Sequence, residues 1–167
     1  MPEPLARMSP SELAQLSDEQ LEESLISYVS EIVCAAPNEI EALAAFPEAI
    51  QNWYPTAVLD IEVLNGGFNQ FFFNSSSAYA EMLPDACRKV GIPEVGALVA
   101  EGTRLLTKHA DALHAAEKAG TIDAFFATYI DAPFEHLDDQ YAAREDEWHQ
   151  CRVGYLRSVL DTLAHPR

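Results

Sequence analysis

Apolar residues recur at helical spacing along most of the chain, and no run of strand length alternates apolar with polar residues. Between residues 17 and 37, for example, Leu21, Leu25 and Val29 return every four residues. We therefore predict an all-α fold with seven to nine helices. The helices form a single compact domain over residues 9–167, preceded by a flexible N-terminal tail at residues 1–8.

Serine, asparagine, proline and glycine residues mark where these helices begin and end. Ser9 and Ser17 are each followed three residues later by Glu or Gln, which is the capping-box pattern of a helix start. Gly91 and Pro93 mark the end of one helix and the start of the next. These signals predict helical runs at residues 10–16, 18–37, 38–45, 47–53, 56–64, 75–90, 93–106, 110–119 and 123–129.

The longest predicted element is a C-terminal helix covering roughly residues 134–164. Its apolar stripe includes Tyr141 and Trp148. A separate acidic stripe lies about 120–160° further round the helix axis from Tyr141, and it contains Glu135, Asp139 and Asp146.

Residues 65–74 combine paired glycines, dense phenylalanines and side-chain amides. Gly66 and Gly67 predict the end of one helix and the start of another, because glycine tolerates the left-handed conformation found there. One interpretation is a helix corner in the core, and the other is a ligand pocket lined by phenylalanines and amides. The residues concerned are Glu62, Asn65, Gly66, Gly67, Phe68, Gln70, Phe71, Phe72 and Asn74.

The net charge of the chain bears on its function more than any other feature of the composition. Twenty-seven acidic residues against ten Lys and Arg residues give a formal net charge of −17. Residues 8–87 contain 13 of the acids and no Lys or Arg. Such a field repels nucleic acid and anionic membranes and favours basic proteins or cations.

Four of these acids fall within six residues at the start of the second predicted helix. They are Asp18, Glu19, Glu22 and Glu23, and none has Lys or Arg four residues further on. They are either a solvated helix start or one row of a partner-binding acidic surface, with Glu135, Asp139 and Asp146 as a second row.

Other functional classes find little support. The chain has no long apolar run, no basic-then-apolar N-terminal order and none of the common hydrolase, nucleotide-binding or zinc-protease motifs, so we expect a cytoplasmic protein without catalytic residues or cofactors. Cys34, Cys87 and Cys151 are expected to be free, buried thiols in a reducing compartment. Asp111-x-x-His114 and Asp146-x-x-His149 have the spacing of helical metal ligands, but they place Asp where di-iron bundles use Glu, and we predict no metal site.

The run from Glu62 through Asn65-Gly66-Gly67-Phe68 to Gln70, Phe71, Phe72 and Asn74 resembles the signature of a bacterial domain-of-unknown-function family. The best-described member of that family is an acidic DNA-mimic protein. A second stretch, Phe134-x-x-Leu137-Asp138-x-x-Tyr141, resembles the looser motif before the family's C-terminal helix. The resemblance covers about residues 48–160.

This resemblance implies an all-α homodimer that presents carboxylates in place of DNA phosphates to a helix-turn-helix transcription regulator. The motif itself is expected to be structural, so the acids must supply the function. Helical acids repeat at about 5.4 Å per turn, against about 3.4 Å per phosphate along each DNA strand. We therefore expect a non-enzymatic protein that binds a basic DNA-binding protein and no nucleic acid or membrane directly. An immunity or antitoxin-like protein that neutralises a basic nuclease, and a small-molecule or enzymatic domain using residues 62–74, remain alternatives.

Overall fold

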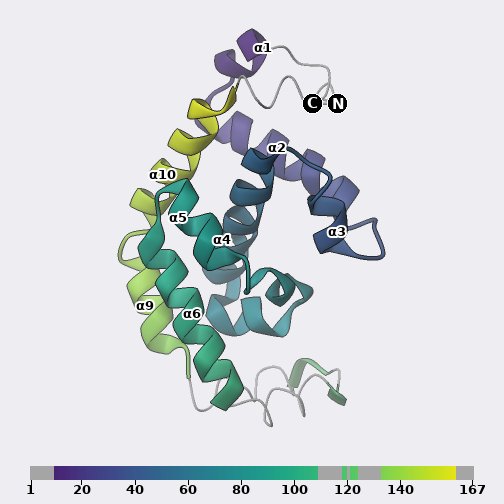
Figure 1. The fold of residues 1–167 in the computed structure, drawn as a ribbon. Coiled ribbons are helices and arrows are strands. Elements are labelled where there is room, and N and C mark those ends of the chain that lie inside the picture. The colour runs from purple at the N-terminus through teal and green to yellow at the C-terminus, as the bar shows by residue number, and fades with distance from the viewer. Residues whose placement is uncertain (1–9, 109–117, 120, 124–132, 161–167) are drawn as a thin grey trace.

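The computed structural model describes residues 10–108, 118, 119, 121–123 and 133–160. All regular structure in these ranges is helical, which confirms the all-α prediction (Figure 1). The elements are α1 (Pro10–Gln15), α2 (Asp18–Val33), α3 (Glu39–Leu43), α4 (Glu48–Phe73), the 3₁₀ helix η2 (Ser75–Tyr79), α5 (Leu83–Val90), α6 (Pro93–Lys108), α9 (Glu135–Ala142) and α10 (Glu145–Ser158). The predicted tail at residues 1–8 and nearly all of the predicted helices 110–119 and 123–129 lie outside the described residues.

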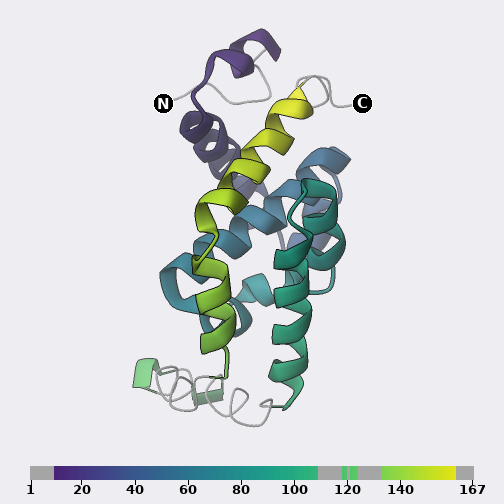
Figure 2. The ribbon, with the colours of Figure 1, turned by 90° about the vertical axis from the view of Figure 1, so that its left-hand side faces the viewer.

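Helix α4 is the centre of the fold. It packs against α2, α5, η2, α9 and α10. Helices α9 and α10 follow each other along one side, with α6 beside α9 and α5 beside α10 (Figures 1 and 2). Several of the predicted helix ends are confirmed. Ser17 and Gln20 form the capping box of α2, Asn38 caps α3, and Gly91 ends α5 in the left-handed conformation at φ 93°.

The stretch before the glycine pair differs from its prediction. The expected helices at 47–53 and 56–64 are one continuous helix, with Pro55 inside it. Proline removes one backbone hydrogen bond, but Trp53 and Tyr54 immediately before it are almost completely buried. Tertiary packing of these two side chains outweighs the local preference for a break. The non-helical backbone at Gly66 and Gly67 then divides α4, as predicted.

The predicted C-terminal helix also differs, because it divides into α9 and α10 near Arg144. The Tyr141 carbonyl oxygen would bond the amide of residue 145 in a continuous helix. Instead it accepts the indole N–H of Trp148 at 3.1 Å and the Arg144 amide at 3.2 Å. The guanidinium of Arg144 lies over the Trp148 ring, 4.1 Å from its centroid, so a cation–π contact accompanies the break.

An aromatic cluster fills the core between the second half of α4 and α9. Phe72 lies 5.0 Å from Phe71 and 5.3 Å from Phe134, measured between ring centroids, and Phe68 packs edge-on to Tyr141. Gly102 of α6 leaves room for this cluster, since a Cβ atom there would lie 2.5 Å from the Phe72 ring. The phenylalanines of residues 68–72 are therefore core residues.

Candidate functional site

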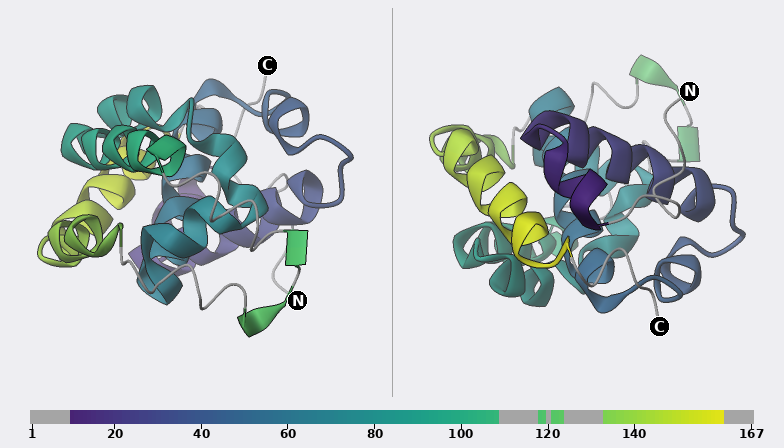
Figure 3. Two further views of the ribbon diagram at one scale, coloured as in Figure 1. Left: turned by 90° about the horizontal axis from the view of Figure 1, so that it is seen from below. Right: turned by 90° about the horizontal axis from the view of Figure 1, so that it is seen from above.

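Helix α10 passes beside the first turns of α2 (Figures 2 and 3). Acidic residues of α2 bond there to arginines of α10. The Arg157 guanidinium donates to the Asp18 carboxylate at 2.6 and 3.0 Å. One oxygen of Glu22 accepts from Arg152 at 3.3 Å, and the other lies 3.1 Å from Nδ1 of His149. The sequence offers Asp18 and Glu22 no Lys or Arg one helical turn further on, but both acids find partners on α10.

Arg152 is the buried centre of this arrangement, with 1% of its surface exposed. It donates to Asp60 of α4 at 2.6 Å as well as to Glu22, and Tyr141 donates to the other oxygen of Asp60 at 2.6 Å. Burial alone would lower the pKa of Arg152. Asp60, Tyr141 and Glu22 face the guanidinium and outweigh this effect, so the pKa of Arg152 is raised above its usual value. Arg152 therefore remains charged and ties α2, α4 and α10 together.

Glu19 and Glu23 differ from their two acidic neighbours because they form no ion pair with any described residue. Both are exposed and lie one helical turn apart on α2. Together with Glu22 they line an open surface pocket of about 420 Å³, whose other walls are Ile26, Ser27 and His149. The start of α2 thus combines two free carboxylates with a hollow that reaches α10.

The second predicted acidic row is exposed but interrupted. Glu135 and Asp139 lie on α9 and Asp146 lies on α10, on opposite sides of the break near Arg144. None of the three forms an ion pair within the described ranges. Asp146 lies one helical turn before His149, which contacts Glu22 and lines the pocket, but Asp146 itself is not among the lining residues.

The paired glycines form a kink that Asp138 of α9 holds. Gly67 has φ 73° and ψ −178°, a conformation that only glycine adopts readily. The Phe68 amide that follows donates to Asp138 Oδ1 at 2.7 Å. Burial raises the pKa of the Asp138 carboxyl above its usual value, and the hydrogen bond from Phe68 opposes part of that rise.

The amides of the same motif bond to one another around Glu62. The Glu62 carboxylate accepts from Gln70 at 2.7 Å, from Asn74 at 2.9 Å and from Ser76 at 3.1 Å, while Asn65 donates to Gln70 at 3.2 Å. These bonds occupy the groups that a ligand in the pocket hypothesis would have used. The geometry supports the alternative, in which residues 62–74 are a structural corner.

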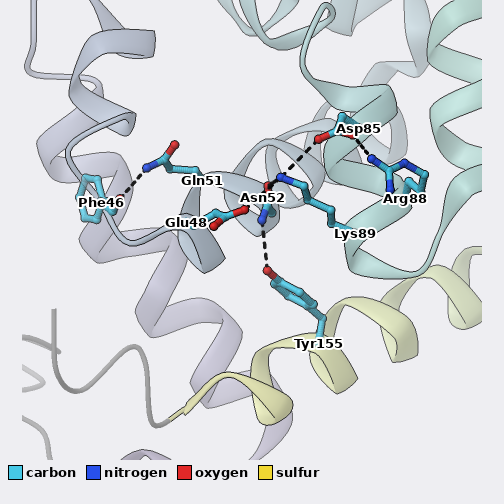
Figure 4. A network of polar contacts seen from close by, with 8 residues as sticks. All are labelled: Phe46, Glu48, Gln51, Asn52, Asp85, Arg88, Lys89 and Tyr155. Carbon is cyan, nitrogen blue, oxygen red and sulfur yellow. Dashed lines mark hydrogen bonds and ion pairs between the residues drawn. The ribbon is translucent and has the colours of Figure 1, made fainter. Parts of the chain in front are cut away.

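Lys89 of α5 is a surface cation that is already paired with acids. Lys89 of α5 lies 3.1 Å from Glu48 and 3.3 Å from Asp85, and it also donates to Asn52 (Figure 4). Asn52 in turn donates to Tyr155 of α10 at 3.4 Å. These contacts join α4, α5 and α10.

The described residues contain three free cysteines and no cluster of potential metal ligands. Cys34, Cys87 and Cys151 are free, as predicted, but the expected burial holds only for Cys87, because Cys34 is exposed and Cys151 is half-buried. Burial raises the pKa of the Cys87 thiol to about 12. No group of three potential metal ligands occurs in the described ranges. Asp111 and His114 lie outside the described residues, and His149 pairs with Glu22.

Sequence reasoning did not identify Arg152, Asp60 and His149 as parts of this site. Arg152 falls four residues after the buried Trp148, and it is itself buried. A charged residue on an apolar helical stripe is a signal of a buried ion pair, but sequence spacing does not reveal which acids face it.

Comparison with known proteins provides one match. A family model described as "DMP19-like protein" matches residues 44–159, close to the range of about 48–160 expected from the motifs. Neither the curated proteins nor the solved structures that were compared gave a significant match. Within the described residues, no helix is long and apolar enough to cross a membrane. Because the matched range covers more than half of the chain, the protein belongs to the DMP19-like family.

Proposed function

We propose that this protein acts as a DNA mimic, which binds the DNA-contacting surface of a basic protein such as a transcription regulator. The family membership agrees with a protein of this type. The observation that carries the proposal is the acidic surface where α2 and α10 meet. Glu19 and Glu23 of α2 are exposed there and form no ion pair with any described residue, and the same holds for Asp146 on α10.

Electrostatics supports a basic protein as the partner. The net charge of −17 attracts cationic surfaces over a range of about 8–10 Å at physiological salt. A surface that binds DNA is rich in Arg and Lys, which release counterions from DNA phosphates on binding. Free carboxylates on a helical surface supply acceptors for the same side chains.

The ion pairs between α2 and α10 also support a binding surface on α2. Arg152 and Arg157 fix the first turns of α2 against α10 through Glu22 and Asp18. The carboxylates of Glu19 and Glu23 therefore project from a helix whose position is already set. Such preorganisation reduces the entropy that binding would otherwise cost.

The test is affinity capture with this protein, followed by purification of any captured DNA-binding protein and binding measurements at several salt concentrations. The double variant E19K/E23K should weaken binding strongly, because it replaces two carboxylates with two cations. The matched control E31K/E81K makes the same change in net charge at two exposed acids outside the pocket, and it should bind nearly as well as the original protein. Equal loss in both variants would indicate attraction to net charge alone and would reject the surface.

We further propose a homodimer as the acting form, as the family resemblance implies. Sedimentation or light scattering at micromolar concentration measures the mass directly. A mass of one 18.4 kDa chain at all concentrations would contradict this part of the proposal.

A further inference from the structure

We propose that the pocket lined by Glu19, Glu22, Glu23, Ile26, Ser27 and His149 binds one arginine side chain of the basic partner. This inference rests on the proposed function and names the contact that anchors the partner. It differs from general charge attraction because it assigns one side chain to one hollow.

The composition of the pocket matches the two parts of an arginine side chain. Ile26 offers apolar surface to the three methylene groups, and Ile26 itself packs against the core, so this wall is fixed. The free carboxylates of Glu19 and Glu23 lie one helical turn apart. They can accept from a guanidinium that offers five N–H donors in a planar fork.

The charge balance of the pocket excludes an anionic guest. Arg152 contacts both Glu22 and Asp60, so one cation faces two carboxylates before Glu19 and Glu23 are considered. The two oxygens of Glu22 are taken by Arg152 and His149, at 3.3 and 3.1 Å. Glu22 therefore holds the pocket in shape, while Glu19 and Glu23 carry the acceptors for the guest.

Arginine fits this arrangement better than lysine. A lysine ammonium is strongly hydrated and presents its donors from one point, whereas a guanidinium is weakly hydrated and spreads its donors across a plane. The Cβ atoms of Glu19 and Glu23 are about 5–6 Å apart, and a planar guanidinium can donate to both carboxylates at once. An apolar wall beside them also favours the guanidinium face.

The experiment uses the full chain labelled with ¹⁵N and three capped peptides, acetyl-Gly-X-Gly-amide, in which X is arginine, lysine or the neutral isostere citrulline. The arginine peptide should shift amide signals of residues 19–27 and of His149 in a saturable titration. Lysine should bind at least about threefold more weakly, and citrulline should cause no saturable shift, because the bonds are charge-assisted.

Two matched variants complete the test. E19Q/E23Q should weaken arginine-peptide binding by about tenfold or more, since both acceptors lose their charge, whereas E31Q/E81Q should leave it unchanged. The proposal is overturned if arginine and lysine bind equally, if shifts spread over other exposed acids, or if E19Q/E23Q binds normally. No DNA-binding protein is needed, so arginine binding without displacement of DNA from any regulator would reject the proposed function and leave the pocket assignment intact.

Discussion

The backbone amide of Phe68 donates to the carboxylate of Asp138 at 2.7 Å, across 70 residues of sequence. This bond joins the kink of α4 to the first turns of α9. Gly67 lies at the point of contact, where a Cβ atom would come within 2.5 Å of Asp138 Oδ2. The most distinctive residues of the chain thus serve the fold.

Replacing Gly67 with alanine should destabilise the protein. The positive φ costs about 1–3 kcal/mol for a residue with a side chain, and the new methyl group would press on Asp138. Urea unfolding followed by circular dichroism measures the loss. The control is Gly154→Ala on α10, where a Cβ meets nothing within 4 Å. That change should raise stability, by up to about 1 kcal/mol, because alanine favours helix more than glycine does. Equal stability of the two variants would contradict the assigned role of Gly67.

The buried Asp138 predicts a specific pH dependence. Because its pKa in the folded protein is raised above the ordinary value of 3.8, the folded state holds the proton more tightly than the unfolded state. Its contribution to stability is therefore complete below pH 3.8 and is lost as pH rises through the folded pKa. Asp138→Asn removes this titration and retains an oxygen that can accept from Phe68.

The measurable quantity is the free energy of unfolding of the original protein minus that of Asp138→Asn. This difference should fall as pH increases from about 4 towards 7, and urea titrations at several pH values will follow it. A difference that is constant or rises with pH would mean that burial does not dominate the environment of Asp138.

Removing the buried Arg152 should be costly. Arg152→Met leaves Asp60 and Glu22 without their shared cation, and breaking a buried pair on one side typically costs about 3–5 kcal/mol. Adding Asp60→Asn to Arg152→Met should recover part of the loss, because it removes one of the two orphaned charges. Chemical unfolding of the two single variants and the double variant gives the coupling energy. A loss below about 1 kcal/mol in Arg152→Met would show that the network does not hold α2, α4 and α10 together.

The thiols should differ in reactivity. Cys34 is exposed, whereas Cys87 is fully buried and burial raises its pKa to about 12. The thiolate is the reactive form, so a disulfide reagent at pH 8 should modify Cys34 quickly and reach Cys87 only after unfolding. Peptide mapping after timed labelling identifies each site, and rapid labelling of Cys87 in the folded protein would contradict its burial.

Much of the fold could be predicted from the sequence because its signals are local. The capping box at Ser17 and the left-handed Gly91 act within a few residues, and both were confirmed. The continuous helix through Pro55 and the break near Arg144 were not predicted, because side-chain packing and a side-chain hydrogen bond decide them. The burial of Trp53 and Tyr54 keeps Pro55 within a helix, and the Trp148 indole takes the carbonyl that would have continued α9.

The candidate site was predictable only in part. Sequence located the acids at the start of α2 but gave no indication which of them were already paired. Asp18 and Glu22 bond to α10, some 130 residues away, while Glu19 and Glu23 do not. A helical pattern shows which residues share a face, and the partner of that face depends on how the helices pack.

The most direct test of the account is competition between this protein and DNA for one captured DNA-binding protein. Fluorescence anisotropy of labelled operator DNA should fall to its free value as the protein is added, with displacement weakening as salt increases. E19K/E23K should need at least about tenfold more protein for half-displacement, whereas E31K/E81K should match the original. Simultaneous binding of DNA and this protein to the partner, or equal displacement by both variants, would contradict the claim that the α2 carboxylates occupy the DNA-binding surface.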